Sequence, residues 1–282
     1  MDKEFIHQFI TDALSEDVGD GDHTSLATIE AGTQGKAKLI VKDTGILAGV
    51  ELAKEIFYIV DPDLKLQVFL NDGAEVKPKD IAFEVEGNAQ SILKAERLVL
   101  NCMQRMSGIA TKTKEIVDLL QGTNTKVLDT RKTTPGLRYL EKWAVRIGGG
   151  VNHRFGLYDM ILIKDNHVDY SGGIRRAIEN ANNYVKETGK KLAIEIEVRN
   201  IDELEQVVQT GNVNRILLDN FNFDDLRQAV NMIEGRYITE ASGGITVDNI
   251  RDYADCGVDY VSVGALTHSV KSLDLSLKAV KL

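Results

Sequence analysis

The feature that most constrains this chain is a repeated alternation of short apolar runs and amphipathic stretches through its second half. Each run ends at a polar or glycine turn, and a stretch with apolar residues at helical spacing follows, as in DDLRQAVNMIEG. Continuous apolar strands that alternate with helices are typical of parallel strands covered by helices. We expect strands at Lys126–Thr130, Met160–Lys164, Leu192–Val198, Arg215–Asp219, Tyr237–Ser242 and Tyr260–Gly264.

The positions of the glycine-rich turns favour a barrel over an open sheet. A doubly wound nucleotide-binding sheet carries its phosphate turn after the first strand. Here TRKTTPG follows the first strand, and the glycine clusters follow the last two. Phosphate binding after the last two strands is typical of parallel α/β barrels. The clear strands number fewer than eight, which predicts an incomplete barrel unless another strand lies within GGGVNHRFG.

The first hundred or so residues have a different pattern. Strand-like runs at Gly35–Val41, Leu64–Phe69 and Ile81–Val85 are separated by turn sequences such as NDG and KPKD. A short helix is expected over Lys3–Leu14. This part is predicted to be a small α+β unit. Gln90–Leu120 then has apolar residues at helical spacing, interrupted at Ser-Gly, which predicts one long helix or two in series.

Charge and cysteine content exclude several classes of protein. The net charge is −9 and the isoelectric point is near 5.2, which argues against general binding to nucleic acid or to an anionic membrane. Cys102 and Cys256 lie far apart, so neither a disulfide framework nor a zinc ribbon is expected. We expect a cytoplasmic protein without a signal peptide or membrane span.

Polar residues gather at the expected strand ends. In a parallel barrel those ends meet at one mouth whatever their separation in sequence. Several cations, carboxylates and glycine turns in one mouth of an acidic protein predict a polyanion site, with a divalent metal shared between phosphate and carboxylate oxygens. The residues are Asp129, Arg131, Lys132, Lys164, Glu197, Asp219, Ser242, Gly243, Gly244 and Gly264, with His153 and Arg154 from the preceding turn.

Two further observations concern individual residue types. Glu195 and Glu197 lie on one otherwise apolar strand, and we expect one of them to face the barrel interior. The other histidines, His7, His23, His167 and His268, lack metal-ligand spacing, so a catalytic zinc is not expected.

Several long strings resemble the quinolinate phosphoribosyltransferase family, also called nicotinate-nucleotide pyrophosphorylase (carboxylating). They include ERLVLN, DTRKTTPGLR, KWAVRIGGGVNHRFGLYDMILIKDNH, LLDNF and EASGGIT, and the resemblance spans nearly the whole chain. It implies an N-terminal open α+β sandwich over 1–110, rejoined by 267–282, and an incomplete TIM-like parallel barrel over 111–266. It also implies formation of nicotinate mononucleotide, CO₂ and pyrophosphate from quinolinate and 5-phosphoribosyl 1-pyrophosphate with Mg²⁺, in NAD biosynthesis.

The resemblance also implies roles for individual residues. Arg131, His153, Arg154 and Lys164 would hold quinolinate, and Arg97 would reach in from the neighbouring subunit of a homodimer, itself open to higher assembly. The phosphoribosyl pyrophosphate and its metal would be served by Lys132, Glu197, Asp219, Ser242, Gly243, Gly244 and Gly264. Of these, Lys132, Glu197 and Asp219 would be catalytic, with Glu197 and Asp219 near the Mg²⁺, directly or through water.

Three alternatives stay open at this stage. One is a barrel aldolase that forms a Schiff base through Lys164. Another is a phosphometabolite-binding regulator without turnover, which the carboxylates Glu197 and Asp219 disfavour because they would repel a bound phosphate. The nearest alternative is a homologous enzyme that acts on another heteroaromatic acid.

Overall fold

The computed structural model describes residues 3–280, and these residues form two compact units. Among the described residues, the first unit contains 3–112, 139–148 and 270–280, and the second contains 113–138 and 149–269. The sequence predicts boundaries at 110/111 and 266/267 and assigns 139–148 to the barrel, whereas in the structure this segment belongs to the first unit.

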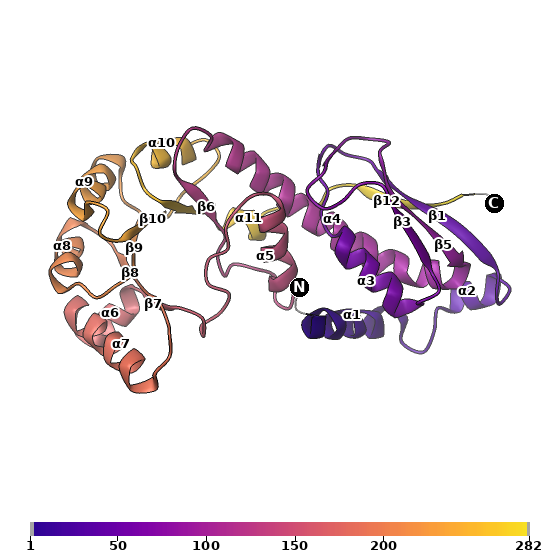
Figure 1. The fold of residues 1–282 in the computed structure, drawn as a ribbon, viewed down its shortest axis with the longest axis horizontal. Coiled ribbons are helices and arrows are strands. Elements are labelled where there is room, and N and C mark those ends of the chain that lie inside the picture. The colour runs from indigo at the N-terminus through magenta and orange to yellow at the C-terminus, as the bar shows by residue number, and fades with distance from the viewer. Residues whose placement is uncertain (1–2, 281–282) are drawn as a thin grey trace. The chain divides into compact units, whose positions relative to one another are not determined.

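The first unit is built on an antiparallel sheet with the strand order β12-β1-β5-β3 (Figure 1). Burial alternates along β1, as period two requires for a sheet with one face in a core. Phe57 of α3 meets Phe83 of β5 edge to face, with ring centroids 5.9 Å apart, so α3 packs on this sheet. The elements are α1 (Lys3–Val18), α2 (His23–Thr28), β1 (Gln34–Val41), β2 (Gly45–Ile46), α3 (Val50–Val60), β3 (Lys65–Val68), β4 (Glu75–Val76), β5 (Ile81–Asn88), α4 (Ala89–Leu119, which continues into the second unit), α5 (Arg138–Ile147) and β12 (Leu275–Val280).

The helix α4 is continuous through the Ser-Gly pair at which the sequence suggested a break. A Cβ on Gly108 would lie 2.3 Å from the carbonyl oxygen of Lys271, so glycine is needed for a backbone contact. The Leu273 N–H donates to the Gln104 carbonyl at 3.0 Å in the same region. The glycine therefore lets the returning C-terminal segment pass α4, and it does not end the helix.

The second unit is a parallel sheet with the strand order β6-β11-β10-β9-β8-β7. Its two outer strands, β6 and β7, are not paired with each other within the described chain, so the barrel is incomplete, as expected. In the segment GGGVNHRFG, a single parallel bridge joins Val151 to Leu128, and no further strand forms among the described residues. The elements are β6 (Lys126–Leu128), β7 (Ile161–Ile163), α6 (Asp165–Ser171), α7 (Ile174–Thr188), β8 (Ile194–Val198), α8 (Ile201–Thr210), β9 (Arg215–Asp219), α9 (Phe223–Ile233), β10 (Ile238–Ser242), α10 (Ile250–Asp255), β11 (Tyr260–Ser262) and α11 (Ala265–His268).

The helices of this unit lie outside its strands (Figure 1). Two of them begin at asparagine caps: Asn200 Oδ1 accepts from Glu203 N–H, and Asn222 Oδ1 accepts from the first amides of α9. No helix in the described part of the chain is both long and apolar enough to cross a membrane. The short βα loops leave the carboxyl ends of the strands free to carry polar side chains.

Candidate active site

A pocket of about 810 Å³ lies in the second unit where its parallel strands end. Residues that follow parallel strands reach the same edge, so side chains distant in sequence meet here. All the residues predicted from this part of the chain line the pocket: Arg131, Lys132, His153, Arg154, Lys164, Glu197, Asp219, Ser242, Gly243, Gly244 and Gly264.

The cations Arg131 and Lys132 lie on the exposed segment that follows β6. The backbone of this segment is fixed on both sides of Lys132. Its N–H donates to Thr130 Oγ1 at 3.0 Å, and its carbonyl accepts from Thr267 Oγ1 at 2.7 Å. The segment therefore holds two positive charges at the pocket on a backbone that is itself hydrogen-bonded.

The turn after α5 is held by a buried carboxylate. Asp129 has no exposed surface, and it accepts from the His153 N–H at 2.8 Å and from Asn152 Nδ2 at 2.6 Å. Asp159 accepts two further amide N–H groups of the same turn, at 2.6 and 2.9 Å. Asp129, which the sequence places at the mouth, thus positions the turn that carries His153 and Arg154.

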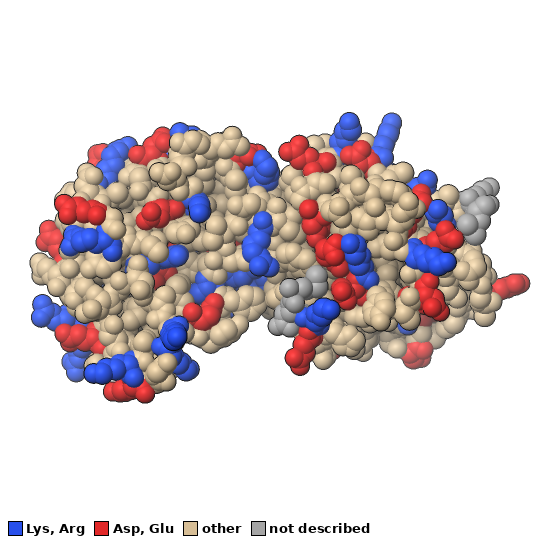
Figure 2. Space-filling view, in the orientation of Figure 1, with Lys and Arg blue, Asp and Glu red and all other residues tan. Residues whose placement is uncertain are grey.

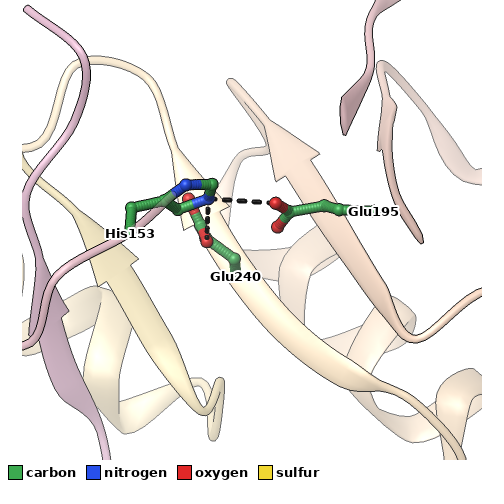
Figure 3. A group of neighbouring side chains, drawn as sticks. All are labelled: His153, Glu195 and Glu240. Carbon is green, nitrogen blue, oxygen red and sulfur yellow. Dashed lines mark ion pairs between the residues drawn. The ribbon is translucent and has the colours of Figure 1, made fainter. Parts of the chain in front are cut away.

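Four charged side chains form what we call the buried charge network: His153, Glu195, Arg215 and Glu240. His153 Nε2 lies 2.9 Å from Glu195 Oε2 and 3.3 Å from Glu240 Oε2 (Figure 3). Arg215 Nη1 lies 3.1 Å from Glu240, and its Nε lies 3.8 Å from Glu195. Two carboxylates and two cationic side chains can therefore balance their charges inside the barrel.

The protonation of His153 follows from this network. Burial lowers the pKa of His153, but the two carboxylates outweigh burial and raise it to about 9. The Arg154 amide N–H faces Nδ1 at 2.7 Å, which disfavours a proton on that nitrogen. Two full charges at Nε2 act more strongly than one amide dipole, so the pKa shift is upward.

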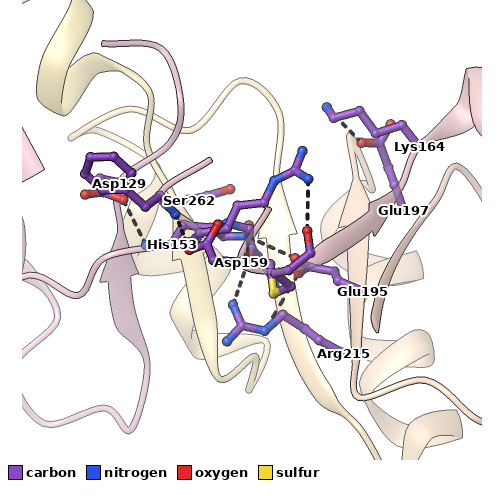
Figure 4. Close-up of polar contacts among 12 residues, drawn as sticks. Asp129, His153, Asp159, Lys164, Glu195, Glu197, Arg215 and Ser262 are labelled. Atoms are coloured by element: carbon purple, nitrogen blue, oxygen red, sulfur yellow. Dashed lines mark hydrogen bonds and ion pairs between the residues drawn. The ribbon is translucent and has the colours of Figure 1, made fainter. Parts of the chain in front are cut away.

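The expectation that only one of the two strand glutamates faces the interior is wrong. Residues two apart on a strand share a face, so Glu195 and Glu197 both point inward. Glu195 is fully buried in the charge network, whereas Glu197 lies nearer the strand end and contacts Lys164, with 3.4 Å between Oε2 and Nζ (Figure 4). The strand therefore carries one structural and one pocket carboxylate.

Glu197 and Asp219 place two carboxylates in the same pocket. Burial raises the pKa of Glu197, the charge of Lys164 lowers it, and the charge of Asp219 raises it again. Two carboxylates that line the same pocket offer hard oxygen donors, and Mg²⁺ prefers such ligands. The residues present thus suit the metal that the sequence resemblance implies.

The turns after β9 and β10 interlock. Asn220 has a left-handed backbone (φ 56°), its N–H donates to the Ser242 carbonyl at 2.8 Å, and its Nδ2 donates to Asp219 Oδ2 at 2.7 Å. Gly243 (φ 96°) and Gly244 (φ 63°) are also left-handed, which suits glycine. Small residues here let backbone N–H groups approach an anion closely.

The pocket lining also includes cationic and apolar side chains. Burial lowers the pKa of Arg154, and the nearby charge of Arg131 lowers it further. Leu162, Leu217 and Ile245 line the same pocket and offer flat apolar surface. An aromatic acid with more than one carboxylate has the charge and shape that such a pocket can bind.

Sequence reasoning did not assign several polar residues that line the pocket, among them Asn220, Glu240, Ser262 and His268. Glu240 lies in the middle of the apolar run YITEAS, away from a strand end, and a buried acid in such a run was the available signal. Asn220 directly follows β9, and Asn222 rather than Asn220 caps α9.

Arg97 lies on α4 in the first unit and is exposed. Within the described part of the chain, the Arg97 side chain forms no hydrogen bond or ion pair, so no residue of its own helix pairs with it. Its predicted role in a neighbouring subunit's pocket stays a prediction.

In this parallel barrel, arginines, lysines, two carboxylates and glycines with a left-handed backbone lie where the strands end. This combination defines a class of protein: an enzyme that acts on a phosphorylated, multiply charged substrate. The chain matches the family description "Quinolinate phosphoribosyl transferase, N-terminal domain" over residues 22–107 and "C-terminal domain" over residues 109–278. The chain belongs to the quinolinate phosphoribosyltransferase family.

Individual relatives agree with this assignment. The chain is 46% identical to quinolinate phosphoribosyltransferase [decarboxylating] 2, mitochondrial, of Nicotiana glauca, over 94% of this chain and 80% of the relative. It is 43% identical to the probable nicotinate-nucleotide pyrophosphorylase [carboxylating] of Bacillus subtilis, over 93% of this chain and 89% of the relative. The crystal structure of NadC from Streptococcus pyogenes superimposes with a TM-score of 0.93 at 38% identity and covers 100% of both chains.

Proposed function

We propose that this protein transfers a phosphoribosyl group from 5-phosphoribosyl 1-pyrophosphate to quinolinate and releases CO₂ and pyrophosphate. The product is nicotinate mononucleotide, a precursor in NAD biosynthesis. The observation that carries the proposal is one pocket lined by several cations, apolar side chains, carboxylates and glycine turns, in a chain of this family. The cations and apolar side chains suit an aromatic diacid, and the carboxylates and glycine turns suit a phosphorylated sugar.

Quinolinate has two adjacent carboxylates on one ring, so it needs more positive charge than a single carboxylate does. Arg131, Arg154 and Lys164 line the pocket together with His153, whose pKa is raised to about 9 by the carboxylates of the buried charge network. Arginine can pair with a carboxylate through two parallel hydrogen bonds, which fixes the ring as well as its charge. These four residues are proposed to bind and orient quinolinate.

A second group of pocket residues is proposed to bind the phosphoribosyl pyrophosphate. Lys132 would neutralise pyrophosphate, and the backbone at Ser242, Gly243, Gly244 and Gly264 would donate N–H groups to phosphate oxygens. Glu197 and Asp219 would hold Mg²⁺, which when bound would neutralise charge on the departing pyrophosphate. The same carboxylates can stabilise positive charge that develops at the ribose C1′.

The reaction needs no enzymic nucleophile. The quinolinate ring nitrogen supplies the electron pair that forms the bond to C1′, and the bond from C1′ to the pyrophosphate oxygen breaks. The ring nitrogen is then cationic and accepts the electrons left when the adjacent carboxylate departs as CO₂; a proton replaces that carboxylate. Lys164 Nζ lies 3.4 Å from Glu197 Oε2, an ion pair that the Schiff-base alternative would have to break.

The direct test is to incubate the protein with quinolinate, phosphoribosyl pyrophosphate and Mg²⁺ and to follow CO₂ release, with nicotinate in parallel. Quinolinate should turn over. Nicotinate, which lacks one carboxylate, should have a kcat/KM at least ~100-fold lower, because the cations that pair with the second carboxylate would remain unpaired. Equal activity with both acids would contradict the assignment and favour a different heteroaromatic substrate.

A shared active site is the second part of the proposal: Arg97 would enter the pocket of the other subunit of a homodimer. The variants Arg97→Ala and Lys132→Ala should each be nearly inactive. Unfolding and reassembling an equal mixture should recover about one quarter of wild-type activity, since half of the dimers are mixed and each has one intact site. If subunit exchange is complete and no activity returns, Arg97 acts within its own chain.

The cellular compartment stays a prediction. The cysteine content favours a cytoplasmic protein, whereas the names of related plant proteins place those proteins in mitochondria or chloroplasts. Fractionation of the source cells, with detection of the protein in each fraction, would decide between them.

A further inference from the structure

The buried charge network is an unusual solution for a barrel interior. Glu195 is 0% exposed on β8, which also carries Glu197, and Glu240 is 1% exposed on β10, whose other residues are uncharged. Replacing buried ion pairs with apolar side chains of similar volume is often neutral or stabilising. Stability alone therefore gives little reason for two carboxylates at these positions.

The charge of Glu195 is balanced by two neighbours. Its Oε2 lies 2.9 Å from His153 Nε2, and its Oε1 lies 3.8 Å from Arg215 Nε. Burying a carboxylate costs free energy unless it is paired. The arrangement is consistent with a role for which His153 needs two acceptors at Nε2.

The network runs along the barrel interior toward the pocket. Arg215 is the first residue of β9 and lies at the opposite end of that strand from Asp219. Its guanidinium lies 4.8 Å from the ring centre of Tyr260, a cation–π contact that fixes it from a second side. From Arg215 the contacts pass through the two glutamates to His153, which lines the pocket.

His153 in turn contacts the backbone of its neighbour. The Arg154 amide nitrogen lies 2.7 Å from His153 Nδ1, so a tilt of the ring would move the Arg154 backbone directly. The Arg154 side chain lines the pocket, and its Nη1 donates to the Met160 carbonyl at 3.3 Å. Both edges of the imidazole are therefore in contact with protein groups.

We propose that Glu195 and Glu240, anchored by Arg215, are positioning residues that fix the ring of His153 and thereby the backbone that presents Arg154 to quinolinate. The proposal rests on the proposed function, since it concerns the quinolinate side of the same pocket. In the ring form with its proton on Nε2, that nitrogen donates to the carboxylates while Nδ1 accepts from the Arg154 N–H. The raised pKa of His153 agrees with strong contacts at Nε2.

A metal ion at these side chains is the competing explanation. The ligand atoms of His153, Glu195 and Glu240 all lie within 4.8 Å of one another, close enough for such a site. Arg215 already pairs with both carboxylates, and its positive charge would repel a cation bound between them. The geometry therefore points to an internal ion-pair network.

The test uses Glu240→Leu, which removes an acceptor, and Glu240→Gln, which keeps an acceptor oxygen and the shape. We expect Glu240→Leu to raise the KM for quinolinate by between about tenfold and about 100-fold, as for a misplaced binding group, and to leave the KM for phosphoribosyl pyrophosphate within about twofold. Glu240→Gln should raise the quinolinate KM less. Nitrogen-15 NMR of the free protein should show altered His153 ring and Arg154 amide signals in Glu240→Leu.

The matched control is Asp259→Asn. Asp259 Oδ2 accepts from the N–H and the hydroxyl of Thr239, both at 2.8 Å, beside the start of the same strand, β10. This variant should lose stability but keep both KM values and the NMR signals of His153 and Arg154. It separates a general loss of stability from a loss of positioning.

The possible results of these experiments lead to different conclusions. Unchanged quinolinate KM in a folded Glu240→Leu protein would overturn the proposal, and so would equal rises in both KM values. If Glu240→Leu does not fold, the quinolinate KM and the NMR signals of Glu240→Gln decide in the same way. Metal detected in stoichiometric amount in the purified wild type, and lost in Glu240→Gln, would also overturn it. An inactive wild type would refute the proposed function, while the NMR signals would still test the network.

Discussion

Replacing Gly243 with alanine tests the interlocked turns at the phosphate side of the pocket. Gly243 has a φ of 96°, and a Cβ there would lie 2.1 Å from Asn220 Oδ1 and 3.0 Å from the Asn220 backbone nitrogen. The left-handed backbone costs an alanine about 1–2 kcal/mol. Moving the Asn220 side chain would also break its contact with Asp219, worth about 1 kcal/mol for an exposed hydrogen bond.

Gly243→Ala should therefore lower the free energy of unfolding by about 2–3 kcal/mol. The control is Gly189→Ala, at the end of α7, where φ is 64° and nothing lies within 4 Å of the added Cβ. It has the same backbone penalty without the collision, so it should lose about 1–2 kcal/mol. Urea unfolding followed by circular dichroism measures both, and the difference between the variants isolates the collision with Asn220.

The kinetic consequence should be confined to one substrate. Displaced backbone N–H groups at residues 243 and 244 should raise the KM for phosphoribosyl pyrophosphate at least ~10-fold in Gly243→Ala, with little change for quinolinate. In Gly189→Ala both KM values should match the wild type. A Gly243→Ala protein as stable as Gly189→Ala, with an unchanged KM for phosphoribosyl pyrophosphate, would refute the reasoning.

The other predictions concern the rest of the pocket. Arg131→Ala should chiefly raise the KM for quinolinate. Glu197→Ala or Asp219→Ala should lower kcat and change its dependence on Mg²⁺ concentration. Wild-type kcat at every Mg²⁺ concentration in these two variants would contradict the proposed role of the carboxylates. The pKa of His153 is raised from 6.5 to about 9 on folding, so the stabilisation from its protonated ring is complete below pH 6.5 and is lost as the pH rises through 9. Urea midpoints should fall over that range in the wild type and fall less in His153→Gln, and parallel profiles would show that another group is responsible.

Much of the pocket could be predicted because its residues lie where strands end. Strand ends are visible in a sequence as the point where an apolar run meets polar or glycine residues, and parallel topology then brings them together. Lys164 and Asp219 were found in this way. The resemblance of the long strings to the family then assigned the pocket residues to one substrate or the other, which residue spacing alone cannot do.

The buried carboxylates were harder to predict because their partners are set by packing in three dimensions. Glu240 contacts Arg215 and His153, which lie on other segments of the chain, and no local pattern joins the three. The role of Gly108 was hard to predict for a related reason. A glycine within a helical pattern can mark a helix break or a close approach of another backbone segment, and here the backbone at Lys271 lies close to Gly108. Both cases depend on contacts between segments far apart in sequence.

The pairing of β12 with β1 has a consequence for how the chain folds as it is synthesised. β1 lies between β5 and β12 in its sheet, but β12 follows the whole barrel in the chain. While the barrel is being made, one edge of β1 has no strand partner, and an open edge of this kind can pair with other chains. A variant that lacks 275–282 should therefore aggregate during expression even though every pocket residue is retained, and supplying that segment as a separate peptide should restore soluble protein.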